Sequence, residues 1–237
     1  MHVKIIFIVL FSLLVCQFLN SKELHFAFEK YAPYEYMENN TAKGLTIEIL
    51  NGFCKLNDII PIYHELSWSA AYNKTIAGDY DAVFSISKNQ ERLDYFYYTS
   101  VPHVTSAVVI AIPISSTKTA RSLEDMNKWV VGCVKDNYYG KIFTDCTSIN
   151  KVMFGNSENC LKRLNSGTLD AVVFNEDVLN HYTKELGLQN TYKILFRIES
   201  VHYYIAFSKK KGDVSKKFAE ELSVFIKNHV NRSGLPK

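Results

Sequence analysis

The chain has 237 residues, a formal net charge of +3, a hydrophobic content of 47% and an aromatic content of 14%. This hydrophobic content excludes a disordered chain, and the near balance of acidic and basic residues argues against a nucleic-acid partner. The basic run at residues 209–211 is too short to follow a phosphate backbone, so we expect it to be solvated at the end of a strand.

The first 21 residues have the composition of a secretory signal peptide. Residues 3–19 are almost unbroken apolar sequence behind Lys4, and polar residues follow them. We therefore expect an exported protein that begins near Lys22. Cys16 ends a stretch that is similar to a lipoprotein cleavage box, but Val15 stands where such boxes have a small residue, so we do not expect a lipid anchor.

The cysteines and histidines beyond residue 21 form no metal-binding pattern. Cys54, Cys133, Cys146 and Cys160 match no C-x-x-C spacing, and the histidines lie far apart in the sequence. We therefore expect no metal and no cofactor. An exported chain folds in an oxidising compartment, which permits one disulfide, and the spacing leaves its pairing open.

Strands and helices alternate along the chain. The pattern predicts a strand at 24–28, a helix at 46–56 and a strand at 60–64, whose proline indicates the end or the edge of a sheet. A helix at 68–77 and a strand from residue 82 follow. The remaining predicted elements are strands at 104–112, 128–134 and 151–154, a short helix from 139, a helix at 158–165, a long crossing segment at 193–208 and an amphipathic helix at 214–230.

A weak internal repeat organises these elements into two similar units. Residues 78–85 read GDYDAVFS and residues 167–174 read GTLDAVVF, and each stretch follows a predicted helix. Gly78 and Gly167 lie where a helix C-terminus favours a left-handed residue, and the apolar run beyond each predicts a buried parallel strand. The repeat therefore predicts two α/β lobes with a cleft between them.

Small hydroxyls and a lone arginine follow the strand that begins at residue 82. Ser85 and Ser87 alternate at its end, and Arg92 comes five residues later. Ligands of open α/β sheets bind at the carboxyl ends of strands, and a guanidinium can hold a carboxylate by two parallel hydrogen bonds. The stretch predicts a carboxylate-binding site in the cleft. The alternative is that Arg92 is an ordinary surface residue of the turn at 89–94.

Several motifs, taken in their order and spacing, resemble one family over essentially the whole chain beyond residue 21. They are 31-YAPYEY-36, 44-GLTIEIL-50, Trp68, 78-GDYDAVFS-85, Glu91-Arg92 with 96-FYYTSVP-102, 123-LEDMNKWVVGC-133, and 166-SGTLDAVV-173 leading to Asn175. With these motifs the chain resembles the type II periplasmic solute-binding proteins of polar amino-acid uptake systems, in the bacterial extracellular solute-binding family 3.

The resemblance implies an α/β fold of two lobes, with a hinge made of two crossing segments. We expect a signal peptide at 1–21, a lobe I of residues 22–105 plus 198–237, and a lobe II of residues 106–197. The family further implies a monomeric periplasmic protein that captures a small carboxylate-bearing solute, a polar amino acid or a derivative. Such a protein delivers its solute to a membrane ABC permease.

Two alternative functions stay open at this point. One is a ligand-binding sensor component that passes its signal to a partner protein. The other is a periplasmic dehydratase of cyclic acids, in which Glu176 could act as a general acid. The sequence contains no nucleophile–base pair, nucleotide-binding loop or metal motif, so we expect a protein that is not an enzyme.

The resemblance also assigns roles to individual residues. It places Tyr31 and Trp68 where the family stacks aromatic rings around a solute, although without the resemblance both residues are better explained as core aromatics. It places Ser85, Ser87 and Arg92 at the positions that grip the carboxylate of the solute.

Two positions depart from the family pattern. Asn175 stands where the family commonly has an aspartate for the α-ammonium of the ligand, and Tyr138 stands where a small hydroxyl usually meets the carboxylate. An amide accepts a hydrogen bond from an ammonium without the charge assistance that a carboxylate gives. Glu35 and Glu176 could supply the missing negative charge, although we expect both to be solvated. A standard α-amino acid is therefore in doubt as the ligand, whereas a carboxylate is expected.

Overall fold

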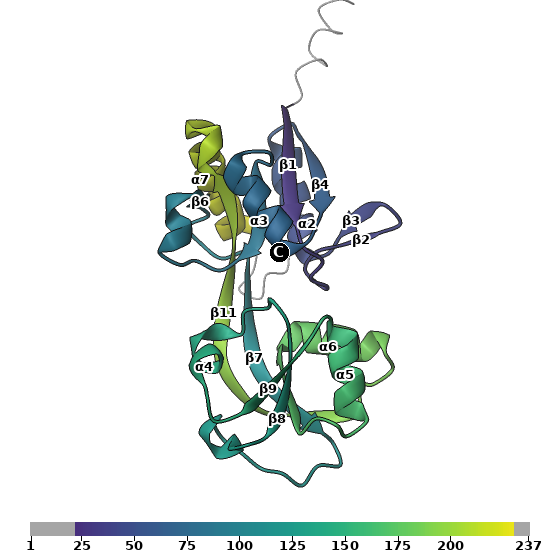
Figure 1. Ribbon diagram of the computed structural model, residues 1–237. Helices are drawn as coiled ribbons and strands as arrows, with labels where there is room; N and C mark the ends of the chain where they lie inside the picture. The colour runs from purple at the N-terminus through teal and green to yellow at the C-terminus, as the bar shows by residue number, and fades with distance from the viewer. Residues whose placement is uncertain (1–21, 230–237) are drawn as a thin grey trace, which may run out of the picture.

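The computed structural model describes residues 22–229, which form two lobes joined by two long strands (Figure 1). The predicted signal peptide and the lipid-anchor position Cys16 lie outside the described residues. No helix of the described part is long and apolar enough to cross a membrane.

Lobe I, the upper lobe in Figure 1, is built around a parallel sheet in the order β4-β1-β5. Pro61 lies in β4, which is an edge strand of the sheet, as the sequence predicts. The hairpin of β2 and β3 is not predicted from the sequence. The elements of this lobe are β1 (Lys22–Phe28), β2 (Tyr36–Glu38), β3 (Thr41–Lys43), α2 (Leu45–Leu56), β4 (Ile59–Glu65), α3 (Trp68–Ala77), β5 (Ala82–Ile86), η2 (Glu91–Asp94), β6 (Phe96–Tyr98), η4 (Lys209–Lys211) and α7 (Asp213–His229).

Lobe II repeats this arrangement, with a parallel sheet in the order β9-β8-β10. Its last helix, α6, is not predicted from the sequence. The elements of this lobe are η3 (Glu124–Met126), β8 (Val130–Val134), α4 (Gly140–Asp145), β9 (Asn150–Phe154), α5 (Ser157–Asn165), β10 (Ala171–Asn175) and α6 (Glu176–Glu185).

Two long antiparallel strands connect the lobes, at the positions that the sequence predicts for the crossings. β7 (Val104–Pro113) pairs with β10 of lobe II, and β11 (Tyr192–Ser208) pairs with β5 and β6 of lobe I. The two strands also pair with each other, so β4-β1-β5-β11-β7-β10-β8-β9 is one continuous sheet. The exact lobe boundaries at residues 105 and 198 stay a prediction.

The two sequence repeats occupy equivalent places in the two lobes. Gly78 and Gly167 have φ angles of 92° and 74°, and each follows the helix that precedes the third strand of its lobe. The aspartate three residues after each glycine makes the same contact in both lobes. Asp81 accepts a hydrogen bond from the backbone N–H of His25 at 2.8 Å, and Asp170 accepts one from Val130 at 2.8 Å. Each aspartate therefore holds the parallel strand beside its own, at His25 within β1 and at Val130 at the start of β8.

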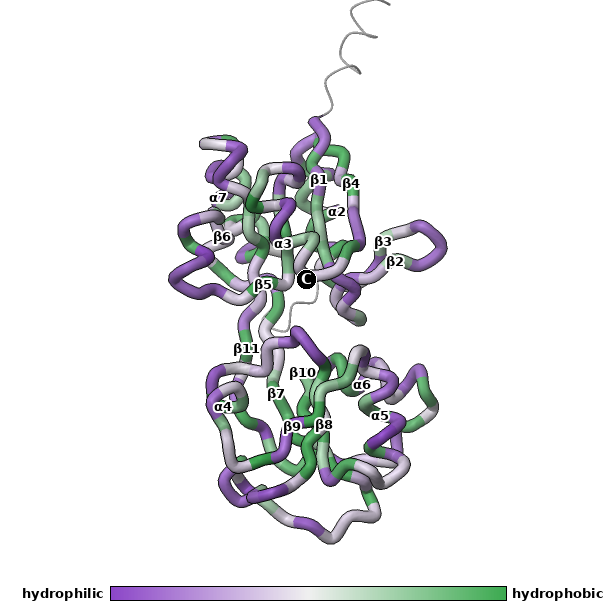
Figure 2. Tube along the Cα trace, in the orientation of Figure 1, coloured by the Kyte–Doolittle hydropathy of each residue, from purple (hydrophilic) through white to green (hydrophobic). Residues whose placement is uncertain are grey.

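Each lobe has its own hydrophobic core. Figure 2 shows hydrophobic residues along β7, β8 and β10 of lobe II, while hydrophilic residues gather at the turns. The lobe II core also contains Ala32 and Tyr34, which are both 2% exposed and belong to the loop that leaves β1. This loop at residues 31–36 therefore docks on the opposite lobe.

None of the four described cysteines forms a disulfide. Cys54 packs in the lobe I core, whereas Cys133 and Cys160 are buried in the lobe II core. The thiol of Cys146 lies 3.2 Å from the hydroxyl of Ser148. The disulfide that the sequence permits is therefore not formed among the described cysteines, and Cys54, Cys133 and Cys160 are buried as small apolar residues.

Candidate ligand-binding site

A cavity with a volume of about 80 Å³ lies between the lobes at the carboxyl ends of β1, β5 and β8, and it opens partly to solvent. Its lining consists of Glu29, Tyr31, Glu35, Trp68, Phe84, Ser85, Ile86, Ser87, Arg92, Asp136, Asn137, Tyr138 and Tyr203.

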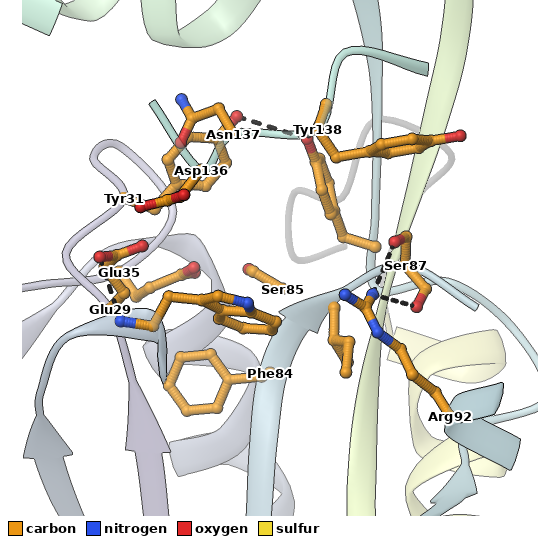
Figure 3. A pocket seen from close by; sticks show the side chains of 13 residues that line it. Glu29, Tyr31, Glu35, Phe84, Ser85, Ser87, Arg92, Asp136, Asn137 and Tyr138 are labelled. Atoms are coloured by element: carbon orange, nitrogen blue, oxygen red, sulfur yellow. Dashed lines mark hydrogen bonds between the residues drawn. The ribbon is translucent and has the colours of Figure 1, made fainter. Parts of the chain in front are cut away.

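Arg92 forms the basic end of the cavity (Figure 3). Its Nη1 donates to the backbone oxygen of Ser87 at 3.0 Å and to the hydroxyl of Ser87 at 2.9 Å. The guanidinium carbon lies 5.7 Å from the ring centroid of Trp68 and 5.5 Å from that of Tyr72. No carboxylate pairs with Arg92 among residues 22–229, so its remaining N–H groups can hold an anion.

The floor of the cavity is aromatic and carries one constrained serine. Phe84 lies between the two ends of the cavity in Figure 3, with Ser85 beside it, and Trp68 also lines the cavity. Ser85 has a φ of 54°, in the left-handed region that serine rarely occupies. Its hydroxyl oxygen is buried, and it interacts with the carboxyl group of Glu35. Backbone strain at a strand end is common at binding sites, where it directs a side chain.

The other end of the cavity is acidic. Figure 3 shows Glu29, Glu35 and Asp136 on the side opposite Arg92. Glu29 accepts a hydrogen bond from the backbone N–H of Trp68 at 3.1 Å. Burial raises the pKa of Glu29, the hydrogen bond from Trp68 opposes this, and the negative charge of Asp136 raises the pKa further.

Glu35 is the most buried of these acids, with 1% of its surface exposed. One carboxyl oxygen accepts a hydrogen bond from the hydroxyl of Thr46 at 2.7 Å. Burial raises the pKa of Glu35 to about 8, and the hydroxyls of Ser85 and Thr46 lower it by a smaller amount. The expectation that Glu35 is solvated is wrong, because the loop at 31–36 carries it between the lobes.

Asn175 lies behind the cavity wall. Its Oδ1 accepts hydrogen bonds from the hydroxyl of Tyr31 at 2.6 Å and from that of Tyr203 at 3.3 Å, and Asn175 is only 1% exposed. The same loop makes a second contact with lobe II, because the hydroxyl of Tyr34 donates to Asp177 at 2.8 Å. Asn175 therefore holds the hydroxyls of Tyr31 and Tyr203 in place and does not itself line the cavity.

Six of the seven residues predicted from the sequence come together at the cavity. They are Tyr31, Trp68, Ser85, Ser87, Arg92 and Tyr138. Their contacts with a solute stay a prediction. Glu176 lies away from the cavity lining and pairs with Arg197 through bonds of 2.7 and 3.0 Å.

Seven lining residues are absent from the predicted site, although Glu35 among them is named from the sequence as a possible source of negative charge. Most of them lie at or just beyond the carboxyl end of a strand, and the rule that selects Ser85 and Ser87 would have included them. Tyr203 is different, since it lies within the crossing strand β11 and carries no sequence signal for the cavity. The seven residues are Glu29, Glu35, Phe84, Ile86, Asp136, Asn137 and Tyr203.

Gly44→Ala should lower the free energy of unfolding by roughly 3 kcal/mol. Gly44 has a φ of 110°, and an added Cβ would lie 2.3 Å from the backbone oxygen of Tyr34, in the loop that carries Glu35. Urea unfolding measures the change. Gly155→Ala is the matched control because nothing lies within 4 Å of its added Cβ. Equal losses of unfolding free energy in the two variants would contradict the steric conflict expected between residue 44 and the backbone of Tyr34.

The comparisons with known proteins agree with this architecture. Residues 24–228 match the family model described as bacterial extracellular solute-binding proteins, family 3. That family consists of non-enzymatic binding proteins, which confirms the expectation that the chain is not an enzyme. No curated protein matches the chain in sequence.

Solved structures share the fold at low sequence identity. A histidine kinase sensor domain with similarity to periplasmic binding proteins has a TM-score of 0.73 and 20% identity, covering 88% of this chain and 92% of its own. The amino acid ABC transporter substrate-binding protein AbpA from Streptococcus pneumoniae, bound to L-arginine, has a TM-score of 0.70 and 21% identity, covering 87% and 88%. Holo ArgBP from T. maritima has a TM-score of 0.70 and 16% identity, covering 87% and 89%. The expected type II periplasmic binding protein fold is confirmed.

Proposed function

Because the chain belongs to family 3 of the bacterial extracellular solute-binding proteins, we propose that it captures a small carboxylate-bearing solute in the periplasm for delivery to a membrane ABC permease. The observation that carries the proposal is the unpaired guanidinium of Arg92 in the cavity between the lobes. Ser87 and the rings of Trp68 and Tyr72 hold this group in place before a ligand arrives. Such a preorganised fork suits a planar carboxylate.

The solute is a polar amino acid or a derivative of one. Two structural relatives are described as arginine-bound or arginine-binding, and their cavities belong to the same fold. The aromatic floor of Trp68 and Phe84 would cover the aliphatic part of such a solute. Asn175, with its oxygen already occupied by two tyrosine hydroxyls, supports a ligand whose positive charge lies elsewhere than at that position.

A sensor component is the second candidate function. The observation that favours it is the similarity in fold to a histidine kinase sensor domain, at a TM-score of 0.73. Both functions use the same cavity and differ only in the partner protein. Genes encoding a permease and an ATPase beside this one would support transport, whereas a neighbouring kinase would support sensing.

A thermal-shift screen of residues 22–237 against amino acids and small carboxylates tests the proposed function. We expect at least one carboxylate to raise the melting temperature, because a ligand that binds only the folded state stabilises it by mass action. The amide or alcohol analogue of that compound should have no effect, since it lacks the anion for Arg92. Equal stabilisation by the carboxylate and its uncharged analogue would contradict the proposal.

A further inference from the structure

Glu35 is a buried carboxyl group with no cation of its own. It lines the cavity, is 1% exposed and accepts a hydrogen bond from the hydroxyl of Thr46. No lysine, arginine or histidine forms an ion pair with it among the described residues. With its pKa at about 8, the carboxyl group of Glu35 is mostly protonated at neutral pH, because burial disfavours its ionised form. A cation bound beside Glu35 would favour the ionised form.

The surroundings of Glu35 favour a positive charge. Glu29 follows β1 of lobe I and Asp136 follows β8 of lobe II, so closure of the lobes brings two like charges together. The cavity lining within the described residues contains a single basic side chain, that of Arg92, and Figure 3 shows it at the far end. A solute with a carboxylate and a distant cation matches both ends at once.

We propose that Glu35 is a proton-releasing contact for the cationic group of the solute. This inference rests on the proposed function and adds to it, because the carboxylate of the same solute is held by Arg92. As the cation reaches the acidic end, the O–H bond of Glu35 breaks and its proton passes to the buffer. The carboxylate oxygen that results then accepts a hydrogen bond from the cation.

Two tyrosines at the cavity, Tyr31 and Tyr203, do not release a proton near neutral pH. Burial raises the pKa of Tyr31 well above its usual value and that of Tyr203 to about 12, so both keep their protons. Thr46 and Ser85, the hydroxyls nearest to Glu35, do not titrate. The remaining ionisable groups at the cavity or its loop are Glu29, Arg92, Asp136, Tyr34 and Tyr138.

One linked proton gives binding a defined pH dependence. Below about pH 8 the free protein must lose the Glu35 proton before the cation can pair with it. The affinity for a cationic solute should therefore rise about tenfold per pH unit up to that point and then level off. A solute without the cation should show no such rise.

Calorimetric titration of the parent protein with L-arginine and L-citrulline tests the inference. The two probes share a carboxylate and an aliphatic chain, but only L-arginine carries a permanent distal cation. At pH 7, L-arginine binding should release nearly one proton to the buffer. The binding enthalpies measured in HEPES and in Tris should therefore differ by nearly the full difference between the ionisation enthalpies of the two buffers. The enthalpy of L-citrulline should be the same in both buffers.

Three variants assign the proton to a residue. Glu35→Gln should abolish proton release with L-arginine, and Glu29→Gln should weaken L-arginine binding while keeping the release. Glu176→Gln is the matched control, because that carboxylate pairs with Arg197 away from the cavity lining and should change neither quantity. The buffer comparison on the parent protein needs no variant to fold.

Three results would overturn the inference. They are equal L-arginine enthalpies in the two buffers, proton release that persists in Glu35→Gln, and failure of L-arginine to bind at pH 8. Each leaves the proposed function intact if L-citrulline or another carboxylate binds and Arg92→Ala removes that binding. A different result would contradict the proposed function, namely carboxylate binding that does not depend on Arg92.

Discussion

Arg92→Ala should weaken binding of a carboxylate solute by roughly 30-fold to several thousand-fold, equivalent to about 2–5 kcal/mol. The loss is large because a carboxylate between the closed lobes would lose its charged partner, and no other basic side chain lines the cavity within the described residues. Calorimetric titration with the best ligand from the thermal-shift screen measures the change. Arg92→Lys should recover only part of the affinity, since an ammonium lacks the planar fork.

A matched control for this variant is Arg197→Ala. Arg197 is an exposed arginine that pairs with Glu176 outside the cavity lining, so its removal should leave the affinity unchanged. The stability of the ligand-free protein should change little in Arg92→Ala, because Arg92 makes no ion pair within the described residues. Binding by Arg92→Ala as tight as that of the parent would show that the solute is held elsewhere.

Much of the fold could be predicted from the sequence, because its strands and helices follow local rules. The apolar run after Gly78 and the one after Gly167 are too short for helices, and both become central parallel strands. α6 was missed because Glu176–Glu185 carries many polar residues, and its buried side chains are Val178, Leu179, Tyr182 and Thr183. The β2–β3 hairpin was missed because its strands have three residues each.

The basic end of the site was more predictable than the acidic end. Ser87 and Arg92 are five residues apart, so local chain geometry brings them together. The burial of Glu35 instead depends on a long-range event, the docking of the loop at 31–36 on lobe II through Tyr34 and Asp177. Asn175 could be placed near the cavity, but its capture by two tyrosine hydroxyls depends on side-chain packing between segments far apart in sequence.

Glu35→Gln should make the protein more stable than the parent at alkaline pH, by roughly 3–5 kcal/mol at pH 9. Burial raises the pKa of Glu35 from 4.5 to about 8, so the unfolded chain ionises first as the pH rises. Glu35 therefore contributes its full stability below about pH 4.5, and this contribution is lost progressively up to about pH 8. A glutamine does not ionise, and its side-chain oxygen can still accept the hydrogen bond from Thr46.

Urea unfolding of both proteins at pH 5 and pH 9 measures this difference. The gap between variant and parent should be less than about 1 kcal/mol at pH 5 and should reach its full size at pH 9, because other titrating groups act equally on both proteins. Glu176→Gln controls for the loss of a carboxylate that is partly exposed and paired, and it should show no comparable growth with pH. A gap of the same size at both pH values would mean that Glu35 is ionised throughout, and that the cavity already supplies the positive charge that we assign to the solute.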